Sequence, residues 1–248
     1  MSRRFFINNI PTFAVSKNQA MSLKKAIFLI LIILLIDQIS KFYIKTHFVL
    51  SEKHVVFSWF QIVFVENEGM AWGTKISDFI PFVSEKMAKL FLSLFRIFAV
   101  CGIGYWLVSV IKNKASRILI VAVALILAGA LGNIIDSVFY GVLFSDSHSE
   151  VATFLPSEGG YASLFHGKVV DMLYFPLWEG VLPNWIPFFG GKFFRFFEPV
   201  FNTADMAISF GIGILIFFNK RAFKEKQQDP VVEEEQEEIQ EETQAEKL

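Results

Sequence analysis

The sequence predicts a mainly α-helical membrane protein with four membrane-spanning helices, and three observations lead to this fold class. Hydrophobic residues make up 54% of the 248 residues and the mean hydropathy is +0.48, which exceeds what a soluble core can bury. Four segments are apolar over about 20 residues, the helical length that crosses a hydrocarbon core of about 30 Å. Basic residues gather at alternate ends of these segments, as in multi-pass membrane proteins.

The four predicted spans divide the chain into a membrane domain and two flanking segments. The spans cover about residues 26–44, 90–111, 118–140 and 200–218, and the outer loops about 45–89 and 141–199. The membrane domain is 24–222, between an N-terminal cytoplasmic segment, 1–23, and a C-terminal tail, 223–248. The tail is acidic and poor in apolar side chains, which predicts disorder. The first span is typical of a retained anchor rather than a cleaved signal, and translation starts at Met1 or Met21.

Basic clusters predict the orientation of the spans. They precede the first span, fill the link between the second and third, and follow the fourth. Their members are Arg3, Arg4, Lys17, Lys24, Lys25, Lys112, Lys114, Arg117, Lys220, Arg221, Lys224 and Lys226. An even number of spans puts all three clusters on the same side, which the preference of Lys and Arg identifies as the cytoplasm. Both termini are therefore expected inside and both longer loops outside.

The two outer loops contain strand and aromatic signals. The stretch "HVVFSWFQIVFVEN", residues 54–67, is rich in β-branched and aromatic residues and predicts one or two strands. The second loop contains "FFGGKFFRFFEP", in which aromatic residues are interleaved with Lys192 and Arg195. This composition suits a segment lying at the lipid headgroups, and it equally suits an aromatic hairpin packed on the rest of the loop.

Charged residues inside the first span point to a buried contact, because a bilayer disfavours them. The stretch "DQISK" puts Asp37 and Lys41 four residues apart on the same helix face, where the two side chains can pair. The pair either holds the bundle together near its outer mouth or contacts a substrate.

The third span carries small residues beside a polar face. Ala124, Ala128 and Gly132 are spaced by four, which lets helix backbones approach closely. Asn133 and Asp136, in "GNIID", share a face that should point into the bundle. Asn133 either hydrogen-bonds a ligand or ties two helices together. For Asp136, near the outer boundary, a structural role is favoured over a ligand contact.

Two further aspartates are predicted to meet at the outer membrane boundary. Asp171 follows a short β-branched stretch in "KVVDM", and Asp205 lies with Asn202 in "FNTAD", at the outer end of the fourth span. A carboxylate in a span costs about 2.5–3.5 kcal/mol at the helix centre, and less near an interface. Two carboxylates held close share a proton, so the charged acid can activate water while the neutral acid donates a hydrogen bond. The sequence therefore predicts an acid–base pair, Asp171 and Asp205.

Other chemistries lack their signatures in this sequence. The four histidines lie in loops without ligand spacing and cysteine pairs are absent, so we expect no metal and no cofactor. Basic residues flank the spans instead of forming a patch, which argues against nucleic acid. Two alternative functions are a proton- or ion-coupled transporter, which intramembrane acids also fit, and a non-catalytic scaffold. Transporters often show internal repeats, and this chain shows none.

Five motifs, in this order, resemble those of lipoprotein signal peptidase, the bacterial signal peptidase II family of membrane aspartyl proteases. They are "DQISK", "NEGMAWG", "AGALGNIID", "VVDM" and "FNTAD", and the resemblance covers about residues 26–218. It implies a four-helix protein of the bacterial inner membrane with a small extracytoplasmic β-cradle. It also implies cleavage of prolipoproteins before a diacylglyceryl-modified cysteine, with lipids as further partners. We expect a monomer.

The resemblance also assigns roles to residues. Asp171 and Asp205 would be the catalytic pair, and Asn67 and Gly69 would lie in the β-cradle. Three side chains would line the polar pocket, namely Asn133, Asp136 and Asn202. Two others would support it, Asp37 and Lys41.

Two departures from the family pattern bear on the site. The family places an arginine after "GNxxD", where this chain has Ser137. The hydrogen bonds that such an arginine can donate to peptide carbonyls or carboxylates are therefore either lost or supplied by another base such as Lys168. The segments between Asp136 and Asp171 and between Asp171 and Asp205 are also longer than in the compact family pattern. The extra structure would shape substrate entry or bind a partner.

Overall fold

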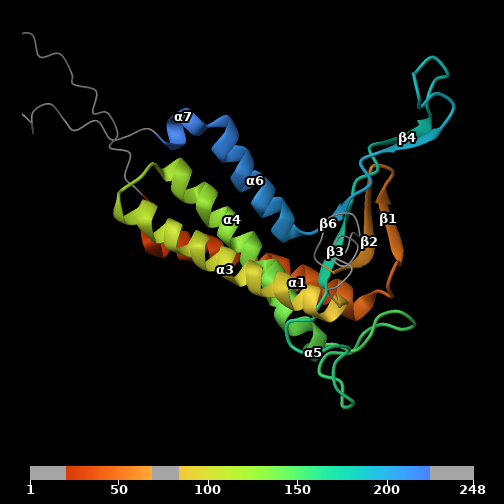
Figure 1. Ribbon diagram of the computed structural model, residues 1–248, viewed down its shortest axis with the longest axis horizontal. Helices are drawn as coiled ribbons and strands as arrows, with labels where there is room; N and C mark the ends of the chain where they lie inside the picture. Colours follow the sequence, from red (N-terminus) through yellow and green to blue (C-terminus); the bar gives the residue numbers. More distant parts are fainter. Residues whose placement is uncertain (1–20, 69–83, 224–248) are drawn as a thin grey trace, which may run out of the picture.

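The computed structural model describes residues 21–68 and 84–223, and it shows a bundle of helices with a small sheet at one end (Figure 1). The helices are α1 Leu23–His47, α3 Glu85–Lys112, α4 Arg117–Ile135, α5 Gly141–Leu143, α6 Thr203–Phe217 and α7 Asn219–Ala222. A π-helical segment, Asp136–Tyr140, joins α4 to α5. The predicted N-terminal segment and acidic tail lie largely outside the described residues.

The predicted helical membrane fold is confirmed. Among the described residues, the helical stretches Leu23–His47, Lys86–Lys112 and Arg117–Leu143 are long and apolar enough to cross a membrane. Helix α6 is apolar but has 15 residues, and it begins at Thr203 rather than near 200 as expected. The difference arises because Val200 and Phe201 pair with β3 as strand β6.

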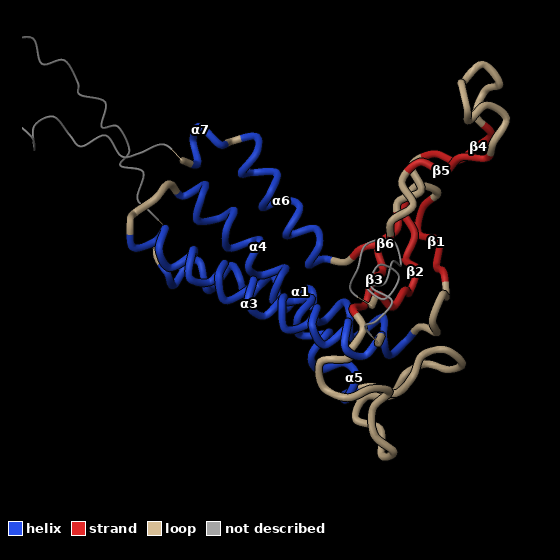
Figure 2. The backbone as a smooth tube through the Cα atoms, in the orientation of Figure 1, coloured by secondary structure: helices blue, strands red, loops and turns tan. Residues whose placement is uncertain are grey.

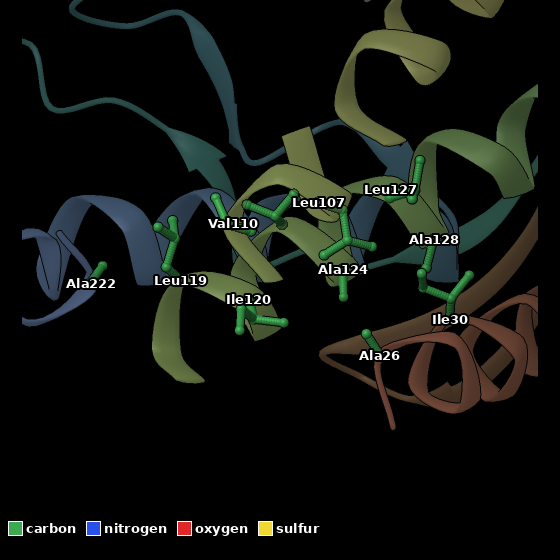
Figure 3. Packing of buried hydrophobic residues seen from close by; sticks show 11 residues of the cluster. Ala26, Ile30, Leu107, Val110, Leu119, Ile120, Ala124, Leu127, Ala128 and Ala222 are labelled. Atoms are coloured by element: carbon green, nitrogen blue, oxygen red, sulfur yellow. The ribbon is translucent and has the colours of Figure 1, made fainter. Parts of the chain in front are cut away.

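The bundle packs around α4. Ala26 and Ile30 of α1, Leu107 of α3 and Ile120 and Ala124 of α4 belong to the same buried apolar cluster (Figure 3). The opposite faces of the outer helices carry large exposed side chains, among them Phe28, Leu35, Phe98 and Phe210. Apolar surface of this extent, on helices of spanning length, is the surface that lipid covers.

The sheet lies beyond one end of the bundle, the end at which α1 finishes and α6 begins (Figure 2). Strands β1 Lys53–Phe57 and β2 Phe60–Asn67 form an antiparallel hairpin, which confirms the strands predicted over residues 54–67. Strand β3, Val169–Tyr174, pairs with β2, and β6 pairs with β3, so the order is β1-β2-β3-β6. This order brings Asn67 of β2 beside Val169 and Asp171 beside Val65.

The aromatic stretch of the second outer loop forms a separate hairpin. Strands β4, Trp178–Val181, and β5, Phe193–Phe196, pair with each other and point away from the sheet (Figure 1). The expected hairpin is therefore present. Its side chains remain largely exposed instead of packing on the rest of the loop.

Helices α4 and α6 approach closely through small residues, as the stripe in the third span predicted. A Cβ added at Gly132 would lie 2.5 Å from Asp37 Oδ2, and one at Gly129 would lie 2.2 Å from the Ala204 carbonyl oxygen. Both values are far below van der Waals contact, so any larger residue would push α6 or α1 away from α4.

We predict that Gly129→Ala lowers the stability of the protein in detergent by about 1–3 kcal/mol, the usual cost of overpacking. Its matched control is Gly213→Ala on α6, where an added Cβ meets nothing within 4 Å and helix propensity is the main effect. Thermal unfolding of both variants measures the difference. Equal melting temperatures would show that the α4–α6 contact tolerates a methyl group.

Candidate active site

A buried ammonium group organises the end of the bundle next to the sheet. Lys41 Nζ lies 2.9 Å from Asp37 Oδ2 and 2.9 Å from Asp136 Oδ2, and it donates to Asn133 Oδ1 at 2.9 Å. The three charged side chains are fully buried. The three hydrogens of the ammonium group are thereby matched by three acceptors, from α1, α4 and the π-helical segment. The predicted Asp37–Lys41 pair is present, and Asp136 is part of it.

Both carboxylates of this ion-pair network also hold backbone from other elements. Asp37 Oδ1 accepts a hydrogen bond from the Ala204 N–H at 2.9 Å, and Asp136 Oδ2 accepts one from the Val170 N–H at 3.2 Å. Ala204 immediately precedes Asp205 on α6, and Val170 immediately precedes Asp171 on β3. The network therefore fixes the backbone next to each of the two predicted catalytic residues.

Gln38 completes the network, and sequence reasoning did not single it out. Its Nε2 donates to Asp136 Oδ1 at 3.0 Å and to Asp37 Oδ2 at 3.1 Å, and its Oε1 accepts from the Tyr140 hydroxyl at 3.2 Å. The available signal was its position between Asp37 and Lys41, because a polar side chain inside a span needs a partner.

Asn202 connects the two predicted catalytic aspartates. Its Nδ2 donates to Asp171 Oδ1 at 2.7 Å. Its side-chain oxygen accepts from the Asp205 N–H at 2.9 Å, while the Asp205 carboxylate accepts from the Asn202 N–H at 3.3 Å. This reciprocal pattern is a capping box at the start of α6. The local sequence "FNTAD" thus starts the helix and brings Asp205 toward β3.

Two more asparagines bind the remaining carboxylate oxygens. Asn133 Nδ2 donates to Asp205 Oδ1 at 2.8 Å, and Asn67 Nδ2 donates to Asp171 Oδ2 at 3.1 Å. Asn133 is held in turn by Lys41. The structure therefore brings together eight of the nine residues predicted for the site, and Gly69 lies outside the described residues.

The environments of the two acids differ. Asp171 is 2% exposed, whereas Asp205 is half-buried at the N-terminus of α6. Burial and, to a lesser extent, the charge of Asp205 raise the pKa of Asp171 to about 7, against the opposing effect of hydrogen bonds from Asn67 and Asn202. The two acids lie near each other because both hydrogen-bond the same residue, Asn202. An acid pair of this kind can hold a proton on Asp171 near neutral pH.

An arginine from α3 occupies the region of Ser137. Arg96 Nη1 donates to Ser137 Oγ at 3.1 Å, and its charge acts electrostatically on Asp205, Asp171 and Asp136. Lys168, which the sequence suggested as the replacement base, pairs instead with Glu66 at 3.1 Å. The available signal for Arg96 was an arginine within a predicted span.

A second ion cluster holds strand β2 against α1. Lys45 Nζ is fully buried, pairs with Glu66 and donates to Ser147 Oγ at 2.7 Å. Glu66 is adjacent to Asn67, so this cluster supports the strand that delivers an amide to Asp171.

Comparisons with known proteins agree on the kind of protein that this chain resembles. Residues 29–220 match the family model described as signal peptidase (SPase) II. A lipoprotein signal peptidase of Porphyromonas gingivalis is 50% identical over 189 residues, covering 76% of this chain and 79% of the relative. One from Amoebophilus asiaticus is 33% identical over 196 residues, covering 77% of this chain and 75% of the relative.

A solved structure shares the fold. A bacterial membrane enzyme determined by the in meso method at 2.3 Å resolution superposes with a TM-score of 0.51. The match covers 86% of this chain and 98% of that chain, at 22% sequence identity.

Proposed function

The chain belongs to the signal peptidase II family and is a membrane protease, and we propose that Asp171 and Asp205 are its catalytic pair. Membership of this family assigns it to the removal of signal peptides from prolipoproteins. At the finer level, we propose cleavage just before a cysteine that carries a diacylglyceryl group. The shared contacts of both acids with Asn202, beside the Lys41 network, are the observation that supports this mechanism most directly.

The differing environments of the acids support an assignment of roles. Asp171 is deeply buried, and its pKa is raised to about 7 by burial and by Asp205, so it is suited to hold the proton. Asp205 is more exposed, lies at a helix N-terminus and accepts hydrogen bonds from two N–H groups, which orient its carboxylate to take a proton from water. Asp205 is then the base and Asp171 the acid.

The reaction follows from these roles. A water molecule between the acids gives a proton to Asp205 and attacks the scissile carbonyl carbon, while the Asp171 proton passes to the carbonyl oxygen. The resulting tetrahedral intermediate collapses when the C–N bond breaks. The leaving amine takes the proton from Asp205, and Asp171 regains its own from the intermediate's hydroxyl group. Each acid therefore ends in the state in which it began.

Arg96 is suited to hold the substrate beside the acids. A guanidinium group presents five N–H donors in a fixed plane and stays charged. Arg96 of α3 contacts Ser137, which belongs to the π-helical segment that begins at Asp136. From there the guanidinium group is within electrostatic range of both acids. We propose that it replaces, from another helix, the arginine that the family pattern places at residue 137. Its partners in the reaction would be carbonyl groups of the substrate peptide.

The arrangement of charges supports the predicted orientation. The start of α1, the link between α3 and α4, and α7 lie at the end of the bundle opposite the sheet (Figure 1), and these regions contain Lys24, Lys114 and Arg221. With that end in the cytoplasm, the acids lie near the outer leaflet, where a lipidated precursor can enter sideways with its acyl chains among the helices. The described site is built within the same chain, which supports a monomeric enzyme.

We predict that Asp171→Asn and Asp205→Asn each reduce cleavage of a diacylglyceryl-modified precursor peptide to background. Asparagine keeps the shape of each side chain but can neither take the proton from water nor give one to the carbonyl. Asp146→Asn, in an exposed outer loop, is the matched control and should cleave normally. Folding of each variant is checked by its melting temperature in detergent. Substantial cleavage by either folded variant would refute the pair.

We also predict that kcat/KM declines as the pH rises through about 7. The pKa of Asp171 is raised to about 7, so at higher pH its carboxyl loses the proton that the carbonyl oxygen must receive. A rate profile between pH 5 and pH 9 measures this limb, with melting temperatures over the same range to separate it from unfolding. A rate that keeps rising to pH 9 would assign the proton elsewhere.

A swap between residues 96 and 137 tests the role of Arg96. Arg96→Ala should lower kcat/KM by about 10- to 150-fold, equivalent to about 1.5–3 kcal/mol for a hydrogen bond to a charged group. The double variant Arg96→Ala with Ser137→Arg should recover much of this loss, because it returns a guanidinium group to the same region. Ser137→Arg alone should be poorly tolerated, since Arg96 fills that space.

The control for the swap is Lys112→Ala, which removes an exposed cation at the opposite end of the same helix. It should cleave at the normal rate. Normal cleavage by Arg96→Ala would show that the reaction does not use this arginine. If the folded double variant keeps the low kcat/KM of Arg96→Ala, a guanidinium group at residue 137 cannot reach the position at which Arg96 acts.

A further inference from the structure

The hairpin β4–β5 presents an aromatic surface outside the catalytic site. Trp185 is 80% exposed and Phe188 is 90% exposed, and Trp178, Phe189 and Phe193 are also exposed. So many large exposed aromatic side chains on the same hairpin mark an interaction site. Tryptophan and phenylalanine at this density are typical of segments that lie at a membrane interface.

The charges of the hairpin are few and largely matched. Between Pro176 and Pro199 the charged residues are Glu179, Lys192, Arg195 and Glu198, so their formal charges cancel. Arg195 pairs with Glu179 at 3.1 Å and with Glu198 at 3.7 Å. The surface is therefore aromatic rather than charged, and its partner must bind mainly through apolar contacts.

The base of the hairpin is tied to the outer end of α6. Phe201 lies in β6, directly before this helix, and its ring contacts Phe197 at 6.0 Å and Phe175 at 5.7 Å between centroids. With 15 residues, α6 is about 22 Å long, shorter than the hydrocarbon core of about 30 Å. Its outer end, and with it the base of the hairpin, therefore lies at the depth of the outer leaflet.

The direction of the hairpin keeps it near that depth. It leaves the sheet sideways, across the direction in which the helices run, instead of continuing away from the bundle (Figures 1 and 2). A segment that runs sideways from the outer end of a spanning helix passes over the lipids beside that helix.

We propose that the hairpin β4–β5 is a membrane-interface anchor whose aromatic side chains insert among the outer-leaflet headgroups beside α6. The occupant of this surface is the same bilayer that covers the helices, so the anchor extends the lipid-facing surface of α6. The chain passes from Asp171 in β3 through this hairpin to Asp205 in α6. Anchoring its tip therefore holds β3 and β6 at a constant height above the membrane.

The test places a fluorescent probe at the tip of the hairpin in the full-length protein. The native cysteine is removed by Cys101→Ala, Phe188→Cys introduces a labelling site, and the probe is an environment-sensitive NBD group. Ser149→Cys, in the other enlarged outer loop, provides a matched exposed control. Both proteins are reconstituted into phosphatidylcholine–phosphatidylglycerol vesicles, and melting temperatures confirm that they are folded.

Two quenchers show whether the probe lies in lipid, in water or against protein. For the probe at residue 188 we expect a blue-shifted emission, a quenching constant for aqueous iodide several-fold lower than at residue 149, and strong quenching by shallow spin-labelled lipids. Raising the salt concentration should leave the lipid quenching unchanged, because the charges of the hairpin are matched.

Two results would overturn the anchor. Equal iodide quenching at residues 188 and 149 would show that the tip lies in water. A probe shielded from both iodide and spin-labelled lipid would show that the hairpin is covered by protein, such as a second copy of this chain. These measurements need no cleavage, so they stand or fall independently of the catalytic pair.

Discussion

The end of the protein that carries the sheet depends on the burial of Lys41 between two carboxylates. A charge removed from water is costly unless it is paired and hydrogen-bonded, and breaking such a pair typically costs about 3–5 kcal/mol. Lys41 satisfies Asp37 and Asp136, yet two carboxylates have more acceptor positions than an ammonium group can fill. The Gln38 amide and the backbone N–H groups of Val170 and Ala204 donate to further positions on these carboxylates. The requirement to satisfy buried charge therefore attaches β3 and α6 to the bundle.

This attachment explains how the site tolerates long insertions. Asp171 and Asp205 lie on separate elements, and a 24-residue hairpin region, 176–199, separates β3 from β6. Because each aspartate follows a residue whose backbone is held by the ion-pair network, the length of chain between them has little influence on their geometry. The same reasoning applies to the loop that separates Asp136 from Asp171. New outer structure can be added there while the acids keep their positions.

Much of the architecture could be predicted from sequence because it follows from local properties. Span length and hydropathy located α1, α3 and α4, and alternation of β-branched and aromatic residues located β1 and β2. The start of α6 was missed by a few residues because Val200 and Phe201 are apolar, and strand pairing with β3 overrides that signal.

Contacts between helices were harder to predict. The polar residues expected at the site do meet, since a bilayer leaves such side chains few other partners. Arg96 was overlooked, although it lies inside a span. Its contact with Ser137 depends on how α3 and α4 face each other, which neither helix's own periodicity specifies.

The chemistry proposed here requires two acids with different protonation states, and secondary structure supplies that difference. Asp171 comes from a buried stretch of strand, and this burial raises its pKa and favours the neutral acid. Asp205 comes from the first turn of a helix, at the positive end of the helix dipole, where the Asn202 N–H and the Asn133 amide donate to its carboxylate. Asn202 contacts both acids, because it caps α6 and donates a hydrogen bond to Asp171 of β3. A strand and a helix N-terminus joined through the same asparagine thus place a proton donor beside a base, with the opposite preferences that hydrolysis needs.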